Sequence, residues 1–153
     1  MVGGPLQRLL LSAFLLLMTT GVLSACGNST PAASAETVSA TVLIEPEAGE
    51  AQWFRDVAVP AGTTGYELLL AATDGEVEAE FSSEFQSHFI EGILGRTPEG
   101  QEFWGNFVWN DEAESWEPVP TGADLVTVED GDVMGWALVE YDPSVADLPT
   151  ARP

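Results

Sequence analysis

The hydrophobic pattern of the chain after residue 37 is mainly that of β-strands. Runs rich in β-branched and aromatic residues at 38–45 and 53–59 flank a segment that contains Pro46 and Gly49. Such runs predict strands, and the residues between them predict a turn. We therefore expect a hairpin with a rather long loop.

The clearest alternation of side chains occurs in residues 102–110. In a strand, alternate residues point to opposite faces, so one face carries three aromatic side chains and belongs to the core. That face carries Phe103, Phe107 and Trp109, and the other carries Trp104, Asn106 and Val108. The second face is expected either to meet solvent or to pack beneath the polar segment that follows, residues 111–124.

One helix is predicted, within residues 61–75. Thr64 followed by Glu67 matches a capping box, and Gly75 is typical of a helix end. The segment 76–86 fits a short strand and a short helix equally well. Residues 87–95 predict a strand, and 125–141 predict two strand runs around Asp130-Gly131.

This order of elements favours an α+β fold in which a mixed sheet has one main helix packed across it. The expected architecture is a β-grasp-like roll over residues 38–141. Residues 142–153 are rich in proline and have no apolar period, so they predict a disordered tail.

The first 25 residues predict a lipoprotein signal peptide. An apolar run too short to cross a bilayer comfortably follows Arg8. Leu23-Ser24-Ala25-Cys26 resembles the bacterial lipobox, and the resemblance implies cleavage before Cys26 and lipid attachment there. The alternative is an ordinary signal peptide cleaved after Ala25. Residues 26–37 predict a flexible tether, which places the domain outside the cytoplasm on a membrane.

The negative charge of the chain restricts the kinds of partner that it can bind. The formal net charge is −21, and all four basic residues are arginines. So acidic a surface repels nucleic acid and anionic lipid headgroups, so no nucleic-acid partner is expected.

Several segments together resemble the transcobalamin C-terminal-like domain family. They are the runs TVLIE, AGTTGYELLLAA, FIEGI, WGNFVWN and VEDGDVMGW, spread over residues 41–136. The resemblance implies a β-grasp fold and a domain that, in transcobalamins, closes over cobalamin beside a helical barrel. The sequence has no segment for that barrel, so any affinity for cobalamin is expected to be weak or to need a partner. The family usually places Asn five residues after the Trp; here Trp104 and Asn110 are six apart, which predicts a bulge or a different equivalent Trp.

Catalysis and metal binding have little support in the sequence. His88 is the only histidine and has no accompanying Ser or Cys motif, so the chain is not expected to be an enzyme. A catalytic role would require His88 to lie near both a carboxylate and a hydroxyl. The acidic runs lack the spacing of a calcium loop, and no metal site or cofactor is predicted.

The candidate ligand-binding residues are aromatic and amide side chains: Trp104, Asn106, Asn110 and Trp116. Exposed aromatics beside amides suit a small planar ligand such as a corrinoid, or a sugar. This hypothesis predicts Trp104 and Trp116 partly exposed in one concavity. The alternative is a surface module for protein interaction or adhesion, with a flat surface, an exposed strand edge and no pocket.

Overall fold

The computed structural model describes residues 36–140 and 148–153, which belong to one compact unit. The signal peptide, Cys26 and most of the tether therefore lie outside the described residues. The elements, in chain order, are β1 (Thr37–Glu45), β2 (Gln52–Pro60), α1 (Gly65–Ala72), β3 (Val77–Ser82), β4 (Ser87–Ile93), β5 (Glu102–Asn110), β6 (Ser115–Pro118), the short 3₁₀ helix η2 (Ala123–Leu125) and β7 (Val133–Glu140).

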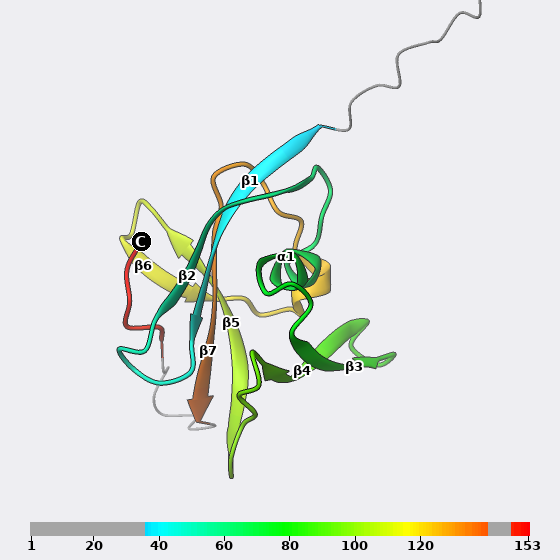
Figure 1. Ribbon diagram of the computed structural model, residues 1–153, viewed down its shortest axis with the longest axis vertical. Helices are drawn as coiled ribbons and strands as arrows, with labels where there is room; N and C mark the ends of the chain where they lie inside the picture. Colours follow the sequence, from blue (N-terminus) through cyan, green and yellow to red (C-terminus); the bar gives the residue numbers. More distant parts are fainter. Residues whose placement is uncertain (1–35, 141–147) are drawn as a thin grey trace, which may run out of the picture. The chain divides into compact units, whose positions relative to one another are not determined.

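The strands form a mixed five-stranded sheet and a separate two-stranded sheet. The larger sheet has the order β2-β1-β7-β5-β6, and the smaller one pairs β3 with β4. In the larger sheet β1 and β7 run parallel, and the other neighbours are antiparallel. Figure 1 shows α1 on one side of the large sheet. The β3–β4 pair lies on the same side, below α1 in this view. The expected α+β arrangement with one α-helix is confirmed within the described residues.

The predicted β1–β2 hairpin is present, with one irregularity in its register. Pairing shifts between Ala40 and Val42 of β1, where β2 carries an additional residue. Asp56 lies at this point with φ of 55°. An extra residue in one strand bends the pair and increases its twist, as in a β-bulge.

The helix forms where the capping box predicts it. The Thr64 hydroxyl accepts a hydrogen bond from the Glu67 N–H, and the Glu67 carboxylate accepts one from the Thr64 N–H at 2.8 Å. Leu68 and Leu69 are fully buried, so this helix of eight residues is stabilised by packing on the sheet.

The two sides of the large sheet have separate cores. The core beneath α1 includes Val42, Leu69 and Trp136, and the core on the opposite side includes Leu43, Phe107 and Trp116. β5 contributes to both, because Trp104 and Phe107 point in opposite directions, as the alternation predicts.

Three sequence expectations need correction or completion. The segment 76–86 contains strand β3, which settles its ambiguity. Only one of the two runs expected in 125–141 is a strand, because residues around Val126 bond to the start of α1 instead: the Gly65 N–H donates to the Val126 carbonyl at 2.9 Å. The bulge suggested for residues 104–110 is absent, since the β5 pairs with β7 and β6 keep a continuous register.

Residues 148–153, at the end of the predicted tail, make specific contacts, and residues 142–147 lie outside the described residues. Pro149 is buried, and the Thr150 N–H donates to the buried Glu45 carboxylate at 2.7 Å. The Trp116 indole N–H donates to the Ala151 carbonyl at 2.7 Å. A single buried carboxylate and one indole therefore hold residues 148–153 in place, and the sequence pattern of the tail itself contains no sign of this.

Candidate functional site

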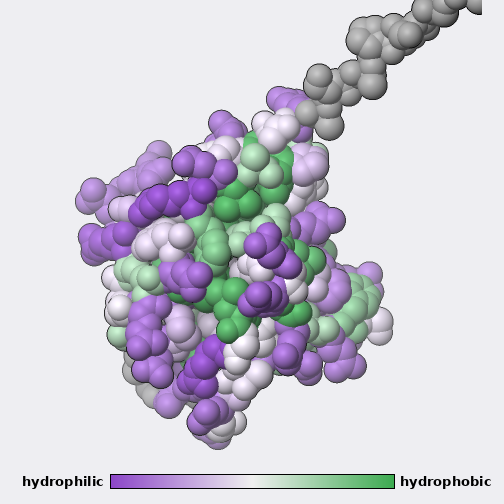
Figure 2. Space-filling view, viewed as in Figure 1, coloured by the Kyte–Doolittle hydropathy of each residue, from purple (hydrophilic) through white to green (hydrophobic). Residues whose placement is uncertain are grey.

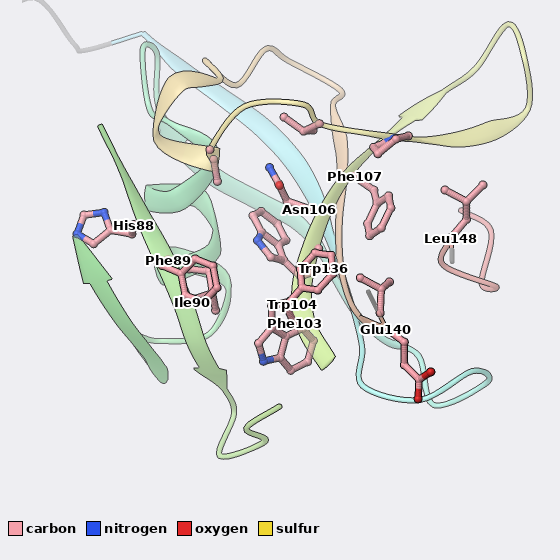
Figure 3. A pocket seen from close by; sticks show the side chains of 16 residues that line it. His88, Phe89, Ile90, Phe103, Trp104, Asn106, Phe107, Trp136, Glu140 and Leu148 are labelled. Carbon is pink, nitrogen blue, oxygen red and sulfur yellow. The ribbon is translucent and has the colours of Figure 1, made fainter. Parts of the chain in front are cut away.

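A cavity of about 380 Å³ lies between β4 and the first half of β5. Most of its wall is apolar or aromatic, and Figure 3 shows side chains from β4, β5 and β7 around it. The residues that line it include His88, Ile90, Trp104, Asn106, Trp136 and Glu140. Ligand cavities in proteins have volumes of ~300–1,000 Å³, so this one is near the lower end.

The cavity lies where β5 has no strand beside it. β6 pairs only with residues Phe107–Asn110, and of the first half of β5 only the Asn106 carbonyl accepts a bond from that side, from the Val119 N–H at 2.9 Å. Side chains from both faces of β5 line the cavity, namely Trp104 and Phe103. The cavity therefore follows an open sheet edge within the described part of the chain.

Two buried hydrogen-bond donors in this cavity have no partner. They are Asn106 Nδ2 and Trp136 Nε1, and they are the only such atoms among the buried side chains that the structure describes. Asn106 and Trp136 lie directly opposite each other in the β5–β7 register, and both line the cavity (Figure 3). By contrast, the Trp104 indole N–H donates to the Arg96 carbonyl at 3.3 Å.

His88 forms one wall of the cavity and is fixed by Asp124. The Asp124 Oδ2 atom accepts from the His88 backbone N–H at 2.7 Å, and Oδ1 lies 2.8 Å from Nδ1 of the ring. The Ser87 hydroxyl donates to the same carboxylate at 2.8 Å. Tyr66 stacks on the His88 ring with centroids 4.0 Å apart. Backbone, hydroxyl and ring contacts thus hold this end of β4 against η2 and α1.

The pKa values near His88 reflect this packing. Burial by itself raises the pKa of the Asp124 carboxyl, but hydrogen bonds from His88 and Ser87 outweigh it and lower the pKa below its usual value. Burial, together with the Asp124 charge, raises the pKa of the Tyr66 hydroxyl. Asp124 is therefore ionised at neutral pH and Tyr66 is protonated.

The close contact between η2 and β4 depends on a glycine. A Cβ atom at Gly122 would lie 1.8 Å from the Ser87 hydroxyl oxygen, far inside contact distance. Any larger residue at 122 would push the 118–123 segment away from β4 and widen the cavity at this end.

The structure does not bring Trp104 and Trp116 together. Trp104 is 6% exposed and belongs to the core beneath α1, whereas Trp116 is 4% exposed and lies on the other side of the sheet. The Trp116 ring packs over Gly135, edge-on to Trp109 and stacked on Trp53. The expected shared concavity of two half-exposed indoles is wrong, because directly paired residues such as Trp109 and Trp116 share one face.

Asn106 and Asn110 also have different surroundings. Asn106 lines the cavity, but Asn110 is part of the β5–β6 turn. Its Nδ2 donates to Glu117, and its Oδ1 accepts from the N–H groups of Glu112 and Ala113. The amide of Asn110 is thus used within the turn.

The β3–β4 hairpin exposes an aromatic surface. Phe81, Phe85 and Phe89 are 52%, 69% and 62% exposed, and Figure 2 shows apolar area over this hairpin with hydrophilic side chains around it. Phe89 also lines the cavity. Its acidic neighbours are exposed as well: Glu78, Glu80, Glu84 and Glu91.

The described residues form neither a cluster of metal ligands nor a membrane-spanning helix. Among the described residues, no three or more His, Cys, Asp or Glu side chains are grouped so that they could hold a metal ion. None of the helices in residues 36–140 and 148–153 has the length and apolar character needed to span a membrane.

Comparison with solved structures shows a related fold. Haptocorrin in complex with Cbi matches with a TM-score of 0.58 and 16% identity, over 71% of this chain and 26% of haptocorrin. A candidate metal-binding protein from Ruminococcus gnavus ATCC 29149 matches with a TM-score of 0.53 and 22% identity, over 69% of this chain and 99% of that protein. No family model and no curated protein sequence matches the chain. At these identities the likeness shows the fold alone, and this chain spans about a quarter of haptocorrin.

Sequence reasoning missed two residues that shape the site. Trp136 was part of a family-like segment, but nothing in its alternating strand distinguishes its unpartnered indole from a core side chain. Asp124 was one acid among 25 acidic residues, so its link to His88 across 36 positions had no local signal.

Proposed function

We propose that this chain is a lipid-anchored, extracytoplasmic binding module that holds a small planar ligand of the corrinoid class in the β4–β5 cavity. The observation that carries the proposal is the cavity itself. It is lined by indole and aliphatic side chains, lies on an open strand edge and contains two donors without partners. Pockets with mostly apolar walls and a few polar groups are typical of small-molecule sites.

The topology supports a β-grasp fold for this module. The first and last strands run parallel at the centre of the sheet, each has an antiparallel neighbour outside, and the helix packs on one face. The structural match to haptocorrin, whose structure contains bound Cbi, supports a ligand of the corrinoid class.

The size of the cavity restricts how a corrinoid binds. About 380 Å³ is too small to enclose a whole macrocycle, so one edge of the ring enters and the rest stays outside. A ring that is only partly enclosed makes less apolar contact with the protein than a fully enclosed one. We therefore expect modest affinity for this chain alone.

The proposed role is binding rather than catalysis. His88 has a carboxylate beside its ring, as a catalytic histidine does, so it is not isolated. However, the Ser87 hydroxyl donates to Asp124 rather than to His88. A serine nucleophile is activated by a hydrogen bond to the base, and this arrangement supplies none.

Lipid anchoring follows from the lipobox-like residues around Cys26. Acyl chains on this cysteine would hold the module at a membrane surface by burial of their methylene groups. The segment 26–37 then separates the folded unit from the bilayer.

Titration of the fragment 27–153 with cobinamide tests the proposed ligand. We expect saturable one-to-one heat, in low and in molar salt, because the apolar contact does not depend on charge. Trp104→Leu should weaken binding, whereas Trp116→Leu, on the far face, should retain the affinity. Both variants lose a buried indole, so circular dichroism must first show that each is folded. The absence of saturable binding at millimolar ligand would contradict the proposal.

A second candidate function is a protein-interaction module, and the three exposed phenylalanines of the β3–β4 hairpin favour it. The fitting partner has an apolar surface bordered by Lys or Arg, because four exposed glutamates surround the hairpin. Phe85→Ser should abolish such an interaction without changing cobinamide binding, since Phe85 does not line the cavity. Ala51→Ser, at an exposed position between β1 and β2, is the matched control.

A further inference from the structure

We propose that the cavity recognises a neutral carbonyl-type oxygen of its ligand, which accepts hydrogen bonds from Asn106 Nδ2 and Trp136 Nε1. The inference rests on the proposed function, because it names the chemical class that the same cavity takes.

Leaving these two buried donors unpaired costs free energy. Buried polar groups in folded proteins are nearly always hydrogen-bonded, and each exception calls for an explanation. Trp136 is 0% exposed, and its Nε1 and the Asn106 Nδ2 have no partner among the described residues. Both residues line a cavity that is large enough for a ligand. A ligand acceptor would remove the cost of both unpaired donors.

The two residues that carry the donors lie opposite each other in the sheet. Asn106 and Trp136 are direct partners in the β5–β7 register. The Asn106 carbonyl bonds to Val119 on the other side of β5, so the main-chain groups of Asn106 point away from β7. In an antiparallel sheet this marks a non-hydrogen-bonded pair, in which the opposing side chains approach most closely. The side chains that carry the two donors are therefore neighbours on one face of the sheet.

The charges around the cavity disfavour an anionic ligand. An amide NH₂ and an indole N–H both donate, so the ligand must supply an acceptor. The described lining contains no arginine, the chain contains no lysine, and Glu140 lies at the cavity. A carboxylate or phosphate would be repelled by Glu140 and by the net charge of −21, and it would lose its hydration without a cation in return.

A neutral amide or ketone oxygen meets these conditions. The apolar walls formed by Ile90 and Trp104 suit the body that carries it. A corrinoid fits because neutral amide side chains surround its macrocycle.

The first test separates the ligand role of Asn106 from a structural role. Asn106→Leu removes the unpaired donor and keeps a similar volume. We expect the ligand-free variant to unfold at the same or a higher urea concentration than the wild type, and its affinity for cobinamide to fall about tenfold or more. Asn110→Leu is the matched control: it should lower stability, because that amide is bonded within the β5–β6 turn, and leave the affinity unchanged. An Asn106→Leu variant that is destabilised yet binds normally would overturn the inference.

The second test compares ligands. Cobyrinic acid has the same macrocycle as cobinamide, with carboxylates in place of the amides. We expect the wild-type fragment 27–153 to bind cobinamide at least tenfold more tightly, and the preference to shrink in Asn106→Leu. Equal affinities, or a preference unchanged by Asn106→Leu, would overturn the inference while leaving the proposed function intact.

If neither macrocycle binds, the proposed function fails, and small probes decide the inference. N-methylacetamide and acetate are then titrated against the protein labelled with ¹⁵N in its tryptophan indoles. A shift of the Trp136 N–H signal with the amide and not with acetate supports the neutral-acceptor site. No shift with either, or an equal shift with both, overturns it.

Discussion

Asp124 binds His88 at two points, since its carboxylate accepts from the backbone N–H at 2.7 Å and lies 2.8 Å from Nδ1 of the ring. Through this pair η2 is attached to β4, and one wall of the cavity is fixed. The pair joins residues 36 positions apart, so it also stabilises the packing of the small sheet against the rest of the fold.

We predict that Asp124→Asn destabilises the protein by about 1–2 kcal/mol at pH 7, because hydrogen bonds to a charged acceptor are replaced by weaker ones. The pKa of Asp124 is lower in the folded state than in the unfolded state, where it is ~3.9. The ionised carboxylate therefore stabilises the fold at pH values above the unfolded pKa, and this contribution is lost as the pH falls through the folded pKa. Urea unfolding from pH 7 to pH 3 should therefore show the variant and the wild type converging in acid. Glu112→Gln, at an exposed position, should show no such difference.

A second prediction concerns the end of the chain. Truncation after residue 147 removes the N–H and hydroxyl donors of Thr150 and leaves the carboxylate of Glu45, 2% exposed, with fewer partners. We expect a loss of about 2–4 kcal/mol at pH 7, since breaking the contacts of a buried charge costs more than breaking those of an exposed one. Removal of Arg152 and Pro153 alone should have little effect, because the contacts to Glu45 come from Thr150, Ala151 and Gly49.

The pH dependence of the truncation follows from Glu45. Burial raises the pKa of this carboxyl, but hydrogen bonds from Thr150, Gly49 and Ala151 outweigh it and lower the pKa. The contribution of these bonds is therefore present above the unfolded value of ~4.3 and lost as the pH falls. The difference in unfolding free energy between full-length and truncated protein should shrink toward pH 3. A difference that stayed constant with pH would show that Glu45 is not its cause.

The local elements of the fold were predictable because their signals are local. Thr64 and Glu67 fix the start of α1, and the alternation of residues 102–110 fixes which side chains of β5 share a face. The non-strand at Val126 was not predictable, because its carbonyl accepts from the N–H of Gly65, which is distant in sequence. Strand β6 was not predictable either, because it lies within the polar segment 111–124, where no apolar alternation marks a strand.

The capping box gives a prediction independent of the site. Thr64→Ala removes the acceptor for the Glu67 N–H and should destabilise the protein by about 1 kcal/mol, while Thr64→Ser should be close to the wild type. Thermal unfolding followed by circular dichroism measures both. Equal midpoints for Thr64→Ala and the wild type would mean that the cap contributes nothing.

The proposed lipid attachment at Cys26 gives a further prediction. In a bacterial host, Cys26→Ser should move the protein from the detergent phase to the aqueous phase of a Triton X-114 extraction, because in this proposal the thiol carries the acyl chain. Ser24→Ala, which keeps a small residue before the cleavage point, should leave the protein in the detergent phase. Retention of Cys26→Ser in the detergent phase would contradict anchoring through this residue.

The candidate site was only partly accessible from the sequence. Alternation placed Trp104 and Asn106 on one face, and both line the cavity. The position of Trp116 depended on the pairing of β6 with β5, which puts it opposite Trp109 and on the far face. The unpaired state of the Trp136 indole is a property of the assembled cavity and leaves no mark on the strand pattern.

The most direct test of the ligand cavity uses the five tryptophans as reporters, because all lie in described strands. Two line the cavity, Trp104 and Trp136, and the other three pack on the opposite side of the sheet, Trp53, Trp109 and Trp116. The indole N–H signals of ¹⁵N-tryptophan-labelled fragment 27–153 are followed by NMR during titration with diamagnetic dicyanocobinamide. The account predicts saturable shifts of Trp104 and Trp136, the latter moving downfield, while the other three stay in place. Shifts confined to Trp53, Trp109 and Trp116, or no shifts at millimolar ligand, would contradict it.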